Sequence, residues 1–137
     1  MATKPEPAPS SSGEILMPFD PERCPFTAAW RVIGGKWKGV LWWRLSLGIG
    51  RFLQLQRSIP QISRKVLAQE LRELERDGIV ARRDVDGSVP TVEYSLTPHG
   101  QSLGPVMAVI VQWGKNHRER AASPAGSAEL EADRRHG

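Results

Sequence analysis

The chain has a single cysteine, Cys24, and no long apolar run. One thiol excludes an internal disulfide framework and is too few for a zinc finger, so ordinary burial must hold the fold together. The longest apolar run, Val106 to Val111, is far too short to span a bilayer, and no apolar segment typical of a signal peptide follows the start. We therefore expect a soluble, cytoplasmic protein with no membrane partner.

The sequence also lacks the residue patterns of an enzyme or a metal site. It contains no nucleophile beside a base, no suitably spaced carboxylate pair and no phosphate-binding loop. His99 and His117 stand apart from any cluster of ligands, and we interpret them as surface or interface residues. We predict that the protein is not an enzyme and uses no cofactor or metal.

Positive charge is concentrated in the middle of the chain. Residues 21–120 carry 16 basic and 9 acidic side chains, a net charge of +7, whereas both ends are slightly acidic. Residues 1–20 and 121–137 are rich in Pro, Ser, Ala, Gly and charge, so we expect a mobile N-terminal tail and a disordered C-terminal tail. The region between them fits one domain. A compact basic body attracts polyanions, most commonly nucleic acid, although proteins that bind none also have basic faces.

Apolar spacing predicts a mainly α-helical fold with one β-hairpin. Helical patterns cover residues 26–33, 37–47 and 51–59, and a fourth runs from Ser63 to Asp77-Gly78. Residues 79–83 and the alternating segment 91–96 predict the hairpin, and Thr97-Pro98 opens a last helix that reaches about Arg118 and is kinked or restarted at Gly104-Pro105. This order is that of a winged helix-turn-helix.

The fourth helix has the properties of a DNA recognition helix. Ser63 is a good N-cap, and Ile62 can staple to Leu67. Three leucines form its inner stripe, while basic and amide side chains project on the opposite side. Its N-terminal half carries two positive charges and no negative one, which favours insertion of that end into the major groove.

The candidate DNA contacts fall into two groups. Base or phosphate contacts are predicted from the recognition helix, and positioning contacts from the supporting helix and the hairpin. The residues are Ser63, Arg64, Lys65, Gln69 and Arg72, followed by Arg51, Arg57, Arg82, Arg83 and Ser88. The same pattern also fits a solvated helix face, on which Glu70, Glu73, Glu75 and Asp77 pair locally with Arg72 and Arg76.

Over roughly residues 23–117, the sequence resembles the HxlR-type winged-helix regulators. The matching positions are Cys24-Pro25, Ile33-Gly34-Gly35-Lys36-Trp37, Arg51-Phe52, Leu55, Ile62-Ser63, Lys65-Val66-Leu67, Leu71, Leu74-Glu75, Asp77-Gly78, Val89-Pro90, Val92-Glu93-Tyr94, Leu96-Thr97, Gly100, Leu103 and Trp113. The resemblance implies a bacterial repressor or activator whose homodimer reads a pseudo-palindrome in double-stranded DNA. The chain departs from the family at Gln61, where Gly is usual, at Ala68, where Thr is commoner, and at Trp42-Trp43, where aliphatics are usual.

The last helix carries more apolar surface than one domain's core covers. We expect it to pack across a two-fold interface together with the 26–33 segment, although a wholly intramolecular core helix is the alternative. The predicted dimer-interface residues are Phe26, Trp30, Leu103, Val106, Met107, Ile110, Trp113 and His117. The tryptophans are expected to pack in the core or interface, and some to line a small-molecule pocket.

Cys24 allows two interpretations. It is either a structurally tolerated thiol or a redox or electrophile sensor, as the resemblance implies for a Cys-Pro at this position. Reactivity requires thiolate character, which neighbouring Arg23 would promote. With one cysteine, any disulfide would join two subunits or a small thiol.

Two other classes of function compete with DNA-binding regulation. A winged-helix module that binds only proteins predicts a neutral or apolar outer face on the recognition helix, and Lys65, Gln69 and Arg72 argue against it. An enzyme would need one of the catalytic patterns that the sequence lacks.

Overall fold

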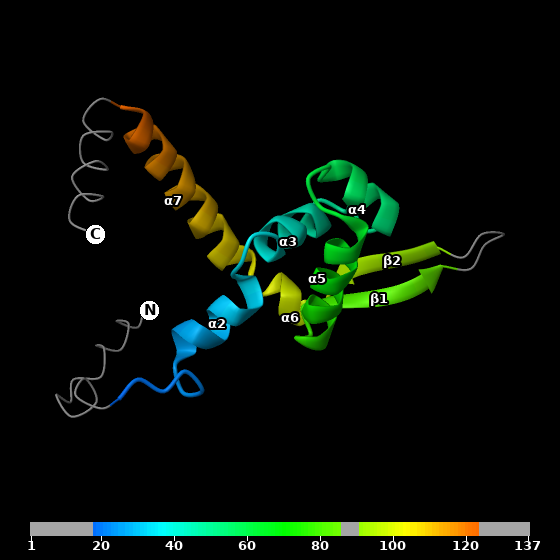
Figure 1. Ribbon diagram of the computed structural model, residues 1–137, viewed down its shortest axis with the longest axis horizontal. Coiled ribbons are helices and arrows are strands. Elements are labelled where there is room, and N and C mark those ends of the chain that lie inside the picture. The colour runs from blue at the N-terminus through cyan, green and yellow to red at the C-terminus, as the bar shows by residue number, and fades with distance from the viewer. Residues whose placement is uncertain (1–17, 86–90, 124–137) are drawn as a thin grey trace.

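The computed structural model describes residues 18–85 and 91–123, and its order of elements is that of a winged helix (Figure 1). The helices α2 (Pro25–Ile33), α3 (Lys38–Ser46), α4 (Phe52–Ser58) and α5 (Arg64–Arg76) come first. The strands β1 (Val80–Val85) and β2 (Thr91–Leu96) follow, and α6 (Pro98–Gln101) and α7 (Gly104–Ala122) complete the chain. The predicted mainly α fold with a hairpin is confirmed.

The ends of the predicted elements agree with the structure to within a few residues. The expected restart at Gly104-Pro105 separates two helices, α6 and α7. The last helix ends at Ala122 rather than near Arg118, because no Gly or Pro stands between Arg118 and Ser123, and Pro124 follows. The tails expected at residues 1–20 and 121–137 lie mostly outside the described residues.

The hairpin is antiparallel and is extended by the segment that precedes α4. Val80 pairs with Leu96, and Arg83 pairs with Glu93. The backbone N–H of Tyr94 donates to the carbonyl oxygen of Gly50 at 2.8 Å, and Arg51 forms an isolated bridge with Glu93. This second line of hydrogen bonds ties the wing to the start of α4.

One hydrophobic core joins α3, α4, α5 and the hairpin. Its fully buried members include Leu41, Leu55 and the leucines of α5, and Tyr94 reaches it from β2. Burying a leucine stabilises the fold by about 2 kcal/mol, so this cluster is the main source of stability for the body. Trp42 is part of the same core, and its indole N–H donates to the carbonyl oxygen of Gly100 at 2.7 Å.

The terminal helices contribute little to this core. None of the nine residues of α2 is buried, and α7 buries only Met107 among its nineteen. Figure 1 shows α2 and α7 leaving the body on the side away from the hairpin. Two helices with large exposed apolar side chains therefore stand beside a compact body.

Candidate nucleic-acid interface

The helix-turn-helix unit is built as the sequence predicts. Helix α4 ends at Ser58, a turn closed by the hydrogen bond from Ile62 N–H to the Ile59 carbonyl at 3.1 Å follows, and α5 begins at Arg64. The Ser63 hydroxyl accepts from the Val66 N–H at 3.1 Å, which confirms the N-cap. Ile62 and Leu67 are both buried, as a staple requires.

The Gln61 departure is accommodated without strain. Among the described residues only glycines have positive φ, so Gln61 occupies the turn in an ordinary backbone conformation. The turn still closes through its own hydrogen bond. A glycine is therefore not required here, and the crossing of α4 and α5 is retained.

Helix α5 separates its two faces clearly. Leu67, Leu71 and Leu74 are at most 1% exposed, which confirms the predicted inner stripe. Lys65 and Arg72, which the sequence places on the outer face, are exposed. The helix thus presents long polar side chains to solvent from a backbone that the core holds firmly, which is what base reading demands.

Local pairing of acidic side chains with the recognition arginines is largely absent. Only Arg76 has an acidic neighbour on this helix, with its Nε 3.7 Å from Asp77. Glu70 and Glu73 pair instead with Lys38 of α3, whose ammonium lies 3.6 and 3.1 Å from their carboxylates. Lys38 was not predicted as a site residue, and its role could not be found from local spacing.

The Lys38–Glu73 pair continues as a chain of hydrogen bonds to the recognition surface. Glu73 accepts from the Gln69 amide at 3.2 Å, and the Gln69 carbonyl accepts from the Arg72 guanidinium at 2.8 Å. Two hydrogen bonds hold the pKa of Glu73 below its usual range: the one from Lys38 has the larger effect, and the one from Gln69 the next. Glu73 therefore stays ionised and orients Gln69 and Arg72 from behind.

At the N-terminal end of α5 the basic side chains connect two helices. The Arg64 guanidinium donates from Nε to the side-chain amide oxygen of Gln56 on α4 at 3.1 Å. Arg57 of α4 is exposed, and so is Arg51, the residue that precedes α4. Arg51 and Arg57 both line a hollow of about 420 Å³ between α4 and β2. Two cations are thus available beside the recognition helix.

The wing carries two further arginines in exposed positions. Arg82 lies 3.7 Å from Asp84 on the same strand, and Arg83 lies 3.6 Å from Glu93 on the opposite strand. Exposed pairs of this kind contribute little to stability and leave guanidinium donors available. Ser88, the remaining predicted wing contact, lies outside the described residues.

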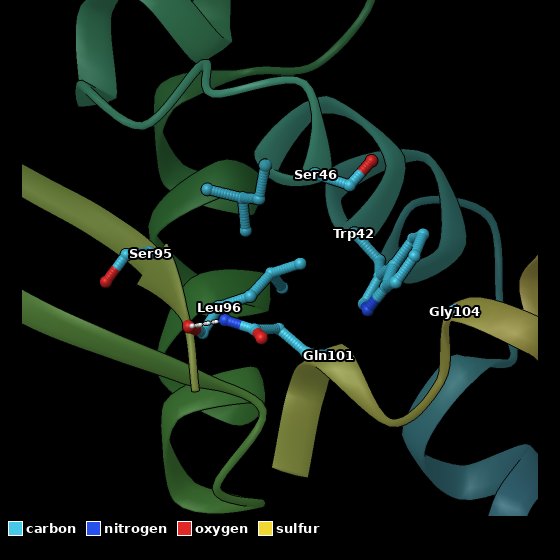
Figure 2. A pocket seen from close by; sticks show the side chains of 7 residues that line it. Trp42, Ser46, Ser95, Leu96, Gln101 and Gly104 are labelled. Atoms are coloured by element: carbon cyan, nitrogen blue, oxygen red, sulfur yellow. Dashed lines mark hydrogen bonds between the residues drawn. The ribbon is translucent and has the colours of Figure 1, made fainter. Parts of the chain in front are cut away.

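A second hollow, of about 360 Å³, has a different character (Figure 2). It lies between α3, the end of β2 and α6, and includes Trp42, Ser95 and Gln101. The Gln101 amide donates to the Leu96 carbonyl at 3.5 Å across it. No charged side chain lines this hollow among the described residues, so it offers little to bind a phosphate.

The terminal helices hold most of the predicted interface residues in exposed positions. Phe26 and Trp30 stack on α2 with ring centroids 5.9 Å apart, and Trp113 stacks on His117 of α7 at 4.9 Å. Their exposed fractions reach 70% for Phe26 and 66% for Trp113. Among the described residues such large apolar side chains have no core to enter.

Two of the predicted interface residues turn inward. Met107 is 5% exposed and belongs to the core beneath Gly39, so it already packs within one chain, and its place at a dimer interface stays a prediction. Leu103 is only partly buried and packs against the same core. The apolar period of the last helix does not distinguish these side chains, because one helix serves two surfaces.

Cys24 occupies the N-cap position of α2 and is partly exposed. Hydrogen bonding with Thr27 lowers the pKa of the thiol, and the Thr27 side chain has a larger effect than the Thr27 backbone. The cause is therefore Thr27 rather than the neighbouring Arg23 that the sequence suggested. A larger thiolate fraction at neutral pH follows.

Within residues 18–85 and 91–123, no cluster of three or more His, Cys, Asp or Glu side chains is arranged to hold a metal ion. Over the same ranges, no helix has both the length and the apolarity needed to cross a membrane.

Comparison with known proteins places this arrangement among DNA-binding regulators. Residues 32–122 match the model of the HxlR-like helix-turn-helix family. The chain is 42% identical over 101 residues to the uncharacterized HTH-type transcriptional regulator YdeP of Bacillus subtilis, which covers 74% of this chain and 79% of YdeP. It is 43% identical over 98 residues to YybR of the same organism, an uncharacterized regulator of the same type, over 72% and 78% of the two chains.

Solved structures agree in fold. The redox regulator HypR in its reduced form superposes with a TM-score of 0.66 at 42% identity, over 69% of this chain and 94% of that one. The reduced form of the transcriptional regulator YodB from B. subtilis gives a TM-score of 0.60 at 35% identity, over 66% and 89%. The family match over residues 32–122 includes the helix-turn-helix, β1, β2 and α7.

Proposed function

Because this chain belongs to the HxlR-like helix-turn-helix family, we propose that it is a transcriptional regulator that binds a pseudo-palindromic operator in double-stranded DNA as a homodimer. The observation that carries this proposal is helix α5, which is buried on its leucine face and exposes Lys65, Gln69 and Arg72 on the other. Gln pairs well with adenine and Arg with guanine in the major groove. The family points to regulation rather than catalysis.

In this proposal the recognition helix reads bases and the surrounding cations fix its register. Ser63, Arg64, Lys65, Gln69 and Arg72 contact the major groove. Arg51 and Arg57 meet phosphates beside α4, and Arg82, Arg83 and Ser88 meet the flanking backbone or minor groove. A regulator with these contacts acts in the cytoplasm, where bacterial DNA is found.

The homodimer is supported by the exposed apolar faces of α2 and α7. Phe26, Trp30, Val106, Ile110 and Trp113 are 43 to 70% exposed, and an apolar patch of this kind marks an interaction surface. Pairing these faces about a two-fold axis would set two recognition helices on the same side of the DNA, about one helical turn apart. His117 joins the patch through its stacking on Trp113.

The test is selection of bound sequences from a random duplex pool by the purified full chain, at low and near-physiological salt. Charge-driven binding falls steeply with salt, whereas base reading does not, so a two-fold symmetric motif is expected at both concentrations. Enrichment of no motif, with binding lost as salt rises, would contradict the proposal. It would favour a winged-helix module that binds proteins instead.

Cys24 is proposed as a redox or electrophile sensor of this regulator. HypR, a redox regulator, is similar to this chain, and the Thr27 hydrogen bonds lower the pKa of the Cys24 thiol. Since the chain has one cysteine, oxidation would join Cys24 to the partner's thiol or to a small thiol. Either product would alter the start of α2, which lies on the proposed dimer surface.

We expect Thr27→Val to make Cys24 less reactive. Loss of the hydroxyl removes the largest cause of the lowered pKa, so the pKa should rise and the thiolate fraction at pH 7 should fall. The rate of alkylation by iodoacetamide, followed against pH, should show its midpoint moving upward and a several-fold slower reaction at neutral pH. Arg23→Gln is the control and should leave the midpoint nearly unchanged. An unchanged midpoint in Thr27→Val would remove Thr27 as the cause.

A further inference from the structure

A groove between α3 and α7, here called the α3–α7 groove, is not used by DNA reading. Its volume is about 650 Å³, within the range of small-molecule sites. Its apolar walls are Val40 and Trp43 from α3 and Met107, Ile110 and Val111 from α7. Gly35 and Gly39 also line it, and a Cβ at Gly35 would meet nothing within 4 Å.

The rim of the groove is cationic. Lys36, Arg44 and Lys115 line it, and no acidic side chain does so among the described residues. The Nε of Arg44 is buried, and no described group accepts its hydrogen bond. A buried donor without an acceptor is costly, and charge-assisted pairing favours an anion at a rim that carries this guanidinium.

The groove is distinct from the surface proposed for dimerisation. At about 100° per residue, Val106, Trp113 and His117 share one face of α7, whereas Met107, Val111 and Lys115 share a face about two fifths of a turn away. Ile110 lies at the border of the two faces and is 43% exposed. Pairing of the first face therefore leaves the second one available.

We propose that the α3–α7 groove binds an amphipathic organic anion, a carboxylate or sulfonate on an aromatic or aliphatic body, as an effector of DNA binding. The apolar walls hold the body, and Arg44 with Lys115 pairs with the charged group. The effector role rests on the proposed function of the chain as a regulator.

Helix α3 provides the connection to the recognition helix. The groove side chains Val40, Trp43 and Arg44 lie on roughly the opposite side of α3 from Lys38, which pairs with Glu70 and Glu73 of α5. A ligand that shifts α3 would therefore move the group that orients Gln69 and Arg72. Allosteric coupling then requires that the ligand bind the two positions of α3 with different affinity.

The test of the site is a fluorescence titration of the full chain with 8-anilinonaphthalene-1-sulfonate, compared with N-phenyl-1-naphthylamine, which has the same body without the sulfonate. We expect Arg44→Gln to raise the Kd for the sulfonate about tenfold and Lys115→Gln to raise it several-fold. Both variants should bind the neutral dye like the wild-type chain. Arg118→Gln, an equal loss of charge one turn further along α7, should change neither titration.

Three outcomes would overturn the site. The sulfonate and the neutral dye could bind with equal affinity, or Arg44→Gln and Lys115→Gln could both leave the sulfonate titration unchanged. The two variants could also dissociate the dimer in sedimentation equilibrium without changing dye binding. That result would mean that a second copy of the chain occupies the groove. Because Lys115 is exposed, its variant keeps the test valid should Arg44→Gln fail to fold.

A separate measurement tests the effector role. The Kd for a labelled operator duplex, from fluorescence anisotropy, should change several-fold with saturating sulfonate, and Arg44→Gln should abolish that change. Dye binding without any change in the operator Kd would overturn the effector assignment. Failure of the wild-type chain to bind any duplex would contradict the proposed function, while the dye titration would still decide the site.

Discussion

Arg72→Ala is expected to weaken binding to the selected operator by about 1 to 3 kcal/mol, roughly fivefold to 150-fold in Kd, and to relax the preference at one base pair. The Arg72 side chain is exposed on the recognition helix, and only one of its nitrogens is held by Gln69, at 2.8 Å. Its remaining donors are free to pair with guanine. The measurement is the Kd for the operator and for a scrambled duplex.

Arg83→Ala is the matched control for this variant. Arg83 stands on the wing beside Glu93 and is proposed to contact phosphate, so its loss should weaken binding to both duplexes alike. The slope of log K against log salt should fall by about one. Should Arg72→Ala weaken binding to the operator and to the scrambled duplex equally, Arg72 would not be a base-reading residue.

Gly100→Ala is expected to lower the free energy of unfolding by about 3 kcal/mol or more. A Cβ at Gly100 would overlap the carbonyl oxygen of Ile79, which already accepts the Thr97 N–H at 3.0 Å. Ile79 is buried at the start of β1, so neither backbone can move away cheaply. The Gly100 carbonyl also accepts the indole N–H of Trp42, and displacement would disturb that bond.

Urea denaturation, followed by circular dichroism, measures this loss. Gly114→Ala is the matched control, because Gly114 lies inside α7 and a Cβ there meets nothing within 4 Å. Alanine there should leave stability unchanged or raise it by up to about 1 kcal/mol. Equal midpoints for the two variants would show that the close approach of Gly100 to Ile79 is not a constraint on the fold.

The Trp42-Trp43 pair shows how one sequence feature separates into two roles. Both residues were expected in the core or an interface. Trp42 is 5% exposed and bonds to Gly100, whereas Trp43 is 37% exposed and lines the α3–α7 groove. Adjacent helical residues point about 100° apart, so only the packing around α3 decides which of them is covered.

The sequence by itself determined the local parts of this protein. The Ser63 cap, the leucine stripe of α5, the hairpin over β1 and β2 and the exposed basic tips all follow from patterns within a few residues, because helix and strand periods are short. The tertiary structure decided which side chains meet from afar. Lys38 reaches the acids of α5, Met107 turns into the core and the α3–α7 groove forms, since such contacts depend on how whole helices pack and not on neighbouring residues.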